Sequence, residues 1–311
     1  MKIKEINLCD VADEWLEIRR MYVKLSTYEK YTNIITTHLK PFFKCHDSID
    51  DSSVFEYMKN NIEEKKLSAS MMHSIRFTLK SILDYAEKKY DYKHVEFQYI
   101  KLPMYSKGCS VLSNKEMEQL VSYCFYEQNS ISTAIIISLY GGLRLGEICA
   151  LSWKDIDLSD GIITVNQTVQ RLKQRNSKLS KTALIISIPK SDTSYRKVVI
   201  PQFLQSYLIE YYKHLGIKDG YILTGSSKIA DPRTIQYQFK RVCHNLGFQT
   251  NFHTLRHTYA TNCVKSGVDI KTLSEMLGHS DISITLSRYV HSSIELKRLQ
   301  VEKIKIPTVM K

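Results

Sequence analysis

Three histidines, an arginine and a tyrosine lie at fixed intervals between residues 253 and 289. On a helix, His253, Arg256 and His257 lie three and four positions apart and share a face. A guanidinium binds phosphate oxygens, imidazoles move protons near neutral pH, and a tyrosine hydroxyl can act as a nucleophile. The run continues to His279 and ends at Tyr289. This pattern favours phosphoryl transfer, with Tyr289 as the attacking group.

Two other interpretations of the histidines were weighed. A metal site is suggested by His253 and His257, but the zinc-protease motif requires Glu directly after the first His, and Thr254 stands there. No third ligand follows at metal spacing, so we expect no metal. A pair of core histidines is the other alternative, and it leaves Arg256 between them unexplained.

A second arginine stands in a glycine-containing break. Gly141 and Gly142 interrupt a helical pattern just before Arg144, and Glu147 follows three residues later, where it can hold the guanidinium. A surface turn with an ion pair is the alternative. The apolar residues around Arg144 argue for partial burial, and a buried arginine requires an anion as partner.

The overall charge indicates the class of that anion. The chain has 311 residues, enough for two domains, and a formal net charge of +12. An excess of this size favours a polyanion as partner, whereas a solvated basic surface without a partner is the alternative.

Composition also suggests a cellular compartment. The seven cysteines form no C-x-x-C pair and mostly lie in apolar helical stretches, which is typical of reduced thiols rather than a disulfide framework. No secretory signal opens the chain, and the longest apolar run, residues 134–139, is too short to span a bilayer. We therefore expect a protein of the bacterial cytoplasm and nucleoid, without a membrane.

The first hundred residues predict a small all-helical domain of about four helices. Capping boxes at 26–29 and 53–56 are expected to start helices, Pro41 to end one, and Ser68 to start the longest. The periodicity fails between 100 and 112, which we interpret as a linker.

One face of the longest predicted helix could follow a DNA backbone. Ser70, His73 and Arg76 lie three apart, and Lys66 precedes them. An ordinary solvated face is the alternative. The side chains expected to contact DNA are Thr27, Lys66, Ser70, His73, Arg76 and Arg233.

The second domain combines helices with strands. A capping box at 113–116 and the Asp231-Pro232 pair mark helix starts. Residues 162–169, 183–188 and 197–200 are rich in β-branched side chains and predict three strands of one antiparallel sheet. Lys190 is expected in the turn between the last two strands, where a lysine is usually just solvated. The predicted fold is mainly α with a small antiparallel β-sheet.

Taken together, these motifs resemble the tyrosine recombinases of the phage integrase family. Gly-Leu-Arg-Leu-Gly-Glu resembles the first arginine box, His-Thr-Leu-Arg-His-Thr the His-x-x-Arg box, Leu-Gly-His-Ser the second histidine and Thr-Leu-Ser-Arg-Tyr the tyrosine box. Pro-Lys-Ser-Asp-Thr-Ser-Tyr-Arg resembles the segment of the β-hairpin lysine. The resemblance implies a helical, SAM-like core-binding domain followed by an α+β catalytic domain.

The resemblance also implies a role for each matching residue. Tyr289 would attack the scissile phosphate and form a 3′-phosphotyrosyl bond, and Lys190 would protonate the leaving 5′-hydroxyl. Arg144 and Arg256 would bind the phosphate. His253 would act in acid–base catalysis, His279 would bond a phosphate oxygen, and Glu147 would support the pocket. The adduct conserves the bond energy, so neither ATP nor another cofactor is implied.

At the level of the assembly, the family implies double-stranded DNA with a specific recombination site and four protomers that pass through a Holliday junction. We expect a DNA-clamping domain over 1–102, a linker over 103–112, a catalytic domain over 113–291 and a tail over 292–311 that docks on a neighbouring protomer. Accessory DNA-bending or directionality factors are possible partners. Because the core-binding pattern starts near residue 13, we expect no arm-binding domain.

Several activities fit these expectations. The leading hypothesis is integration and excision of a mobile element or phage, and Xer-type resolution of multimers is the alternative. A type IB topoisomerase uses similar chemistry, but the two-domain layout and the tail disfavour it. A DNA-binding regulator would not need a complete set of six catalytic residues.

Overall fold

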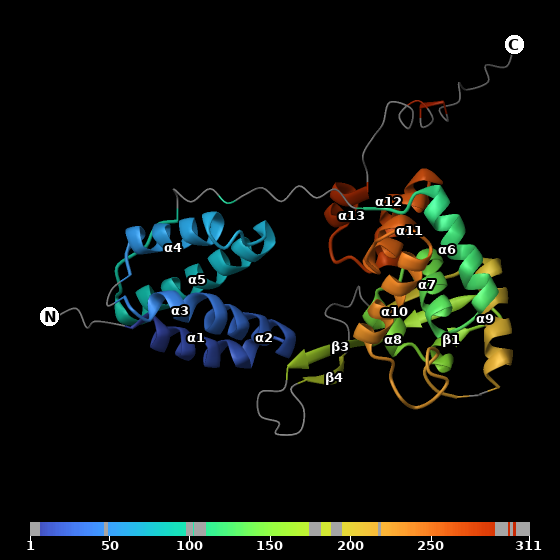
Figure 1. The fold of residues 1–311 in the computed structure, drawn as a ribbon, viewed down its shortest axis with the longest axis horizontal. Helices are drawn as coiled ribbons and strands as arrows, with labels where there is room; N and C mark the ends of the chain where they lie inside the picture. The colour runs from blue at the N-terminus through green and yellow to red at the C-terminus, as the bar shows by residue number, and fades with distance from the viewer. Residues whose placement is uncertain are drawn as a thin grey trace, which may run out of the picture. The chain divides into compact units, whose positions relative to one another are not determined.

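The computed structural model describes residues 7–46, 49–97, 102, 110–173, 182–187, 195–216, 219–289, 298 and 301–302. By its internal contacts the chain divides into two compact units, Met1–Ser106 and Lys107–Lys311 (Figure 1). Among the described residues, no helix is both long and apolar enough to cross a membrane. The prediction of a mainly helical fold with small antiparallel sheets is confirmed.

All the regular elements among the described residues of the first unit are helices. Its core is rich in aromatic residues, with the rings of Phe43 and Tyr57 5.0 Å apart and those of Trp15 and Tyr31 5.1 Å apart. The helices are α1 (Leu8–Tyr22), α2 (Leu25–Ile34), a π-helical turn (Ile35–Leu39), α3 (Lys40–Phe43), α4 (Asp51–Glu63) and α5 (Ala69–Tyr90).

Both capping boxes expected in this unit, at 26–29 and 53–56, were predicted wrongly. Helix α2 begins at Leu25 rather than after Ser26, because the short extended connection after α1 places the Lys24 carbonyl at the helix start. Helix α4 is capped by Asp50, and Ser53 is the reciprocal partner of that cap. Only the predicted start of α5 at Ser68 is confirmed.

Pro41 does not end its helix as expected. The backbone widens into the π-helical turn Ile35–Leu39, in which the Lys40 amide bonds to the Ile35 carbonyl, and Pro41 then lies in the first turn of α3. A missing N–H has no cost in a first turn, so the helical path continues through the proline.

The second unit is built around helix α7 (Ser130–Gly141). This helix is apolar on all sides and almost entirely buried, as expected for a helix in the middle of a core. Around it pack α6 (Asn114–Glu127), α9 (Gln202–Leu215), α10 (Pro232–Asn245) and α11 (His253–Lys265). The predicted caps at Ser113 of α6 and Asp231 of α10 are both present. The remaining helices are α8 (Leu145–Ala150), a 3-10 turn (Trp153–Asp155), α12 (Ile270–Leu277) and α13 (Ile282–Tyr289).

The strands form two sheets rather than the single sheet expected. The first has the order β1-β2-β5 and the second pairs β3 with β4, all antiparallel. In Figure 1, β3 and β4 project from the helices of their unit. The strands are β1 (Ile156–Asp157), β2 (Ile162–Val165), β3 (Thr168–Lys173), β4 (Thr182–Ser187) and β5 (Arg196–Val199).

The predicted strand 162–169 is divided because its second half covers α8. A Cβ on Gly146 of α8 would lie 2.6 Å from the Val169 carbonyl oxygen, so β3 approaches that helix directly. The segment between β4 and β5 therefore links two sheets and is not a hairpin between paired strands. Lys190 of this segment lies outside the described residues.

The N-terminal edge of the second unit is tied to α11. The Leu112 amide donates to the Thr258 hydroxyl over 2.9 Å, and that hydroxyl donates in turn to the Thr254 carbonyl one turn earlier. Through this contact the chain entering the unit is bonded to the helix that carries His253, Arg256 and His257.

Candidate active site

The break after α7 makes room for a buried arginine. Gly142 ends the helix in the left-handed region, with φ +68°, and a Cβ there would lie 2.5 Å from the Tyr259 ring. Only glycine fits both conditions. Its carbonyl oxygen accepts a hydrogen bond from Nη1 of Arg256 over 2.6 Å.

Arg256 is fixed from two sides. Its side chain is 1% exposed, and Nη2 donates to the Leu277 carbonyl over 2.5 Å and lies 3.2 Å from Nε2 of His279. Burial and the charge of Arg144 lower the pKa of the guanidinium to about 9, so it remains charged at neutral pH. None of the described acidic side chains forms an ion pair with it. A buried cation of this kind is ready to receive an anion.

One carboxylate organises two further arginines. Glu147 accepts from the Arg144 amide and from Nη1 of Arg144, both over 2.9 Å. It also accepts from Nη1 and Nη2 of Arg196, over 3.2 and 2.9 Å. Arg196 in turn donates to the Met276 carbonyl over 2.7 Å, and Arg144 donates to the Gly278 carbonyl over 3.3 Å. With Arg256 nearby, the cluster has three guanidiniums for one carboxylate and an excess of positive charge.

We predict that Glu147→Gln lowers stability in a pH-dependent manner. Burial acts to raise the pKa of Glu147, but bonds and charge from Arg196, with the charge of Arg144, outweigh it and hold that pKa at about 2. A depressed folded-state pKa stabilises above the ordinary value of 4.5, and this stabilisation is lost as pH falls towards about 2. Its size is on the order of 3 kcal/mol.

Urea unfolding of the full chain checks this prediction at neutral pH and at about pH 3, where much of the stabilisation from the Glu147 carboxylate is lost. The difference between wild type and Glu147→Gln should shrink in acid, while the exposed control Glu118→Gln stays close to wild type throughout. An equal deficit of Glu147→Gln at both pH values would contradict the assigned pKa.

His279 is oriented by its neighbours. Gly278 ends α12 in the left-handed region, with φ +63°, and the chain turns so that the His279 ring faces Arg256. Its Nδ1 lies 2.9 Å from the hydroxyl of Thr285, a fully buried residue of α13. The Nε2 atom is thereby held towards the arginines, where it can bond an oxygen of a bound anion.

Tyr289 lies at the end of α13 and is 6% exposed. Its ring packs in a cluster with Tyr259, Leu273 and Leu277. The hydroxyl Oη lies 2.7 Å from Nδ1 of His257. His253, which is exposed, packs its ring edge-to-face on His257 with centroids 4.5 Å apart.

The structure thus joins most of the expected catalytic set. Arg144 is bonded to Glu147, Arg256 lies against His279, and the two arginines donate to the adjacent carbonyls of Gly278 and Leu277. Tyr289 is bonded to His257, which contacts His253. Lys190 is outside the described residues. Two members were missed from the sequence, Arg196 and His257. Arg196 follows directly on the lysine segment, but nothing in its spacing shows a carboxylate partner 49 residues away.

The expected DNA-contacting residues fall on both units. Ser70, His73 and Lys66 are exposed at or near the start of α5, as is Arg233 at the start of α10, and Thr27 on α2 is half-buried. Arg76 is half-buried, its Nη2 donates to the Phe97 carbonyl over 3.1 Å, and its guanidinium lies 5.8 Å from the Phe97 ring. This arginine therefore stabilises its own unit.

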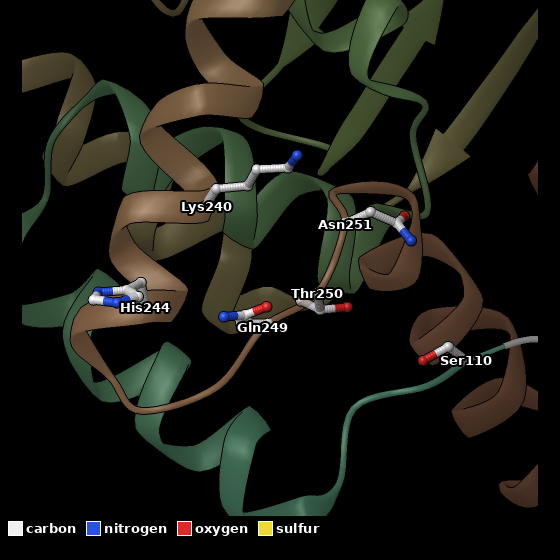
Figure 2. Close-up of a pocket in the computed structure, with 6 residues that line it drawn as sticks. All are labelled: Ser110, Lys240, His244, Gln249, Thr250 and Asn251. Carbon is white, nitrogen blue, oxygen red and sulfur yellow. The ribbon is translucent and has the colours of Figure 1, made fainter.

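An open polar hollow of about 570 Å³ lies beside the start of α11 (Figure 2). Lys240 and His244 of α10 face it from one side, and the loop leading to α11 from the other. None of the arginines of the cluster lines it. Its lining residues are Ser110, Lys240, His244, Gln249, Thr250 and Asn251.

Comparison with known proteins gives matches over nearly the whole chain. The phage integrase family matches residues 110–295, and the phage integrase N-terminal SAM-like domain matches residues 7–46. The chain is 26% identical to a "Tyrosine recombinase XerC-like" protein of Caldanaerobacter subterraneus subsp. tengcongensis, over 97% of this chain and 83% of that protein. It is 27% identical to the ICEBs1 integrase of Bacillus subtilis, over 86% and 74%.

Among solved structures, the Tn1549 transposon integrase in complex with transposon right end DNA has a similar fold. The TM-score is 0.76 at 21% identity, over 96% of this chain and 99% of that one. Against several other curated relatives, the aligned region spans only about half of the relative's length.

Proposed function

The chain belongs to the phage integrase family of tyrosine recombinases, and on that premise we propose that it cuts and rejoins double-stranded DNA at a specific site. The observation that carries this proposal is the surplus of fixed guanidiniums around Arg256 and His279, within the same unit as a tyrosine whose hydroxyl is held by a histidine. Such a pocket binds one phosphodiester and stabilises the charge that develops on it, without a metal.

In the proposed reaction, Tyr289 Oη attacks the scissile phosphorus. The new Oη–P bond replaces the P–O5′ bond, leaving a 3′-phosphotyrosyl adduct and a free 5′-hydroxyl. Arg144, Arg256 and His279 hold the non-bridging oxygens, and Glu147 fixes Arg144. Lys190 protonates the leaving oxygen. Attack by a different 5′-hydroxyl then reverses these steps and joins new partners.

The stoichiometry of strand exchange favours four protomers. Two duplexes have four strands, and each nucleophile forms one adduct, so a complete exchange through a Holliday junction uses four copies of Tyr289. Residues 1–102 clamp the DNA together with the catalytic domain, 113–291, and residues 103–112 connect the two. The tail, 292–311, docks on a neighbouring protomer; most of it, like most of the connection, lies outside the described residues. DNA-bending or directionality factors act at the same sites.

Integration and excision of a mobile element is the biological role that we propose. Its support is the likeness to the ICEBs1 integrase over most of both chains. Xer-type resolution of multimers is a second candidate, favoured by the likeness to the XerC-like protein over 97% of this chain. A plasmid dimer that carries two directly repeated dimer-resolution sites distinguishes the two roles. An element integrase acts only on the two ends of its element and leaves this dimer intact, whereas a resolvase converts the dimer to monomers.

A nicked suicide duplex tests the proposed chemistry. When the strand beyond the cut diffuses away, the adduct cannot rejoin and accumulates. We expect a denaturation-resistant protein–DNA adduct with the element's end sequence, formed in the presence of a chelator. Absence of any adduct on such a duplex would refute the proposal, and relaxation of plasmids without any specific site would point to a topoisomerase instead.

A further inference from the structure

The resemblance to the family assigns acid–base chemistry to His253, yet the structure places a different histidine on the tyrosine. We infer that His257 is the base that takes the phenol proton of Tyr289 at cleavage and returns it at rejoining. This inference rests on the proposed function, in which Tyr289 is the nucleophile. His253 then has a positioning role, through its ring contact with His257.

The geometry singles out this pair. Tyr289 Oη and His257 Nδ1 are 2.7 Å apart, within the range of a strong hydrogen bond between a hydroxyl and a ring nitrogen. The two residues come from different helices, α13 and α11, so the contact is set by tertiary packing. Around the ring of Tyr289 the cluster consists mainly of apolar side chains, including Ala260, Leu273 and Leu277. A hydroxyl in such a place is directed by its hydrogen-bond partner.

His253 makes a different contact in the structure. It begins α11, is exposed, and packs edge-to-face on the His257 ring at 4.5 Å between centroids. The contact restricts rotation of the His257 imidazole and so helps to keep Nδ1 directed at the phenol. His253 thereby acts on the reaction through His257.

The chemistry of the step requires such a base. A phenol with an ordinary pKa near 10 is about 0.1% ionised at neutral pH, so unassisted attack would forfeit roughly three orders of magnitude in rate. In the assisted step the Oη–H bond breaks as the Nδ1–H bond forms, the Oη electron pair forms the bond to phosphorus, and the P–O5′ pair leaves with a proton from the general acid. The positive charge of Arg256 favours the same ionisation, since it attracts a Tyr289 phenolate.

Rejoining reverses each transfer. The incoming 5′-hydroxyl attacks phosphorus, the phenolate leaves, and imidazolium Nδ1–H returns its proton to Oη. A base that serves cleavage is therefore the acid of rejoining, and its loss slows both directions.

The decisive experiment is single-turnover adduct formation on the suicide duplex as a function of pH. For His257→Gln we expect adduct formation at neutral pH to slow about 10²- to 10³-fold, the usual loss on removing a general base. The remaining rate should rise about tenfold per pH unit, because only solvent is left to ionise the phenol. Wild type should show a much flatter profile. The matched control His244→Gln, an exposed histidine on α10, should retain the wild-type rate and profile.

A second measurement does not depend on how well the Gln variant folds. Incorporation of 3-fluorotyrosine at position 289 lowers the phenol pKa, and it should restore part of the rate lost in His257→Gln or His257→Asn at neutral pH. A duplex with a bridging 5′-sulfur, which leaves without a proton, should not restore it. Restoration by the sulfur instead would place His257 on the leaving group and overturn the inference.

The outcomes separate this inference from the proposed function. If wild type forms no adduct, the proposed function fails. If Tyr289→Phe still forms one, another tyrosine is the nucleophile and the inference about His257 fails with the assignment of Tyr289. If wild type forms the adduct and Tyr289→Phe does not, while His257→Gln matches or exceeds the wild-type rate with the same pH profile, the function stands and His257 is not the base.

Discussion

Replacing Tyr289 with Phe should abolish the covalent adduct while leaving the fold and DNA binding intact. Removal of the nucleophile from an enzyme that forms a covalent intermediate lowers the rate on the order of 10⁶-fold. The ring is buried among apolar side chains, so Phe keeps its packing while the hydroxyl contact to His257 is lost. The variant should therefore melt close to wild type.

A denaturing gel of the suicide-duplex reaction gives the readout. The control is Tyr126→Phe, which removes the hydroxyl of a tyrosine 87% exposed at the end of α6 and should leave the adduct unchanged. An adduct that persists in Tyr289→Phe would show that another tyrosine attacks. Tyr259 is a poor substitute, since its ring packs directly against the backbone of Gly142.

Arg256→Ala should separate binding from cleavage. The guanidinium is 1% exposed and adds little to the free basic surface, so affinity for a duplex should change far less than the rate. Loss of one fixed donor to a developing anion costs about 10²–10³-fold, and a buried charge that donates from a planar fork should cost at least that. Arg256→Lys should recover little, because a single ammonium cannot serve both the Gly142 and Leu277 carbonyls and a phosphate.

Adduct formation at saturating duplex, together with a binding titration, checks this prediction. Lys240→Ala removes an exposed positive charge from the same unit and should cleave at the wild-type rate when DNA is saturating. The melting temperature of Arg256→Ala should be measured as well, because the Gly142 and Leu277 carbonyls lose their donor and the variant can be less stable. If Arg256→Ala lost DNA binding as completely as cleavage, Arg256 would be an anchor rather than part of the catalytic pocket.

Helix starts that depend on a few neighbouring residues could be predicted from the sequence. Caps at Ser68, Ser113 and Asp231 are contained in a few consecutive residues, and the structure has all three. The helix start expected at Ser26 and the helix end expected at Pro41 were wrong, because each depends on the neighbouring turn. At Ser26 that turn is a short connection, and before Pro41 it is a π-helical turn.

The site divides in a similar way. The two arginine motifs, His279 and Tyr289 could be found because each carries its own residue pattern. The second partner of Glu147 could not be found in this way, since Arg196 lies on β5 and only tertiary packing brings the two residues together. His257 was visible, but its i, i+4 spacing to His253 suggested a metal pair. The contact that gives it a different role comes from α13, 32 residues away.

The guanidiniums of the pocket are held largely by main-chain carbonyls. Arg256 donates to Gly142 and Leu277, Arg144 to Gly278, and Arg196 to Met276. A carbonyl is present whatever side chain its residue carries, so substitutions at Met276 or Leu277 that preserve the helix leave these acceptors in place. The scaffold of the pocket is thus insulated from much of the mutational drift around it, and the positions that cannot vary freely are the glycines that set the path of the backbone.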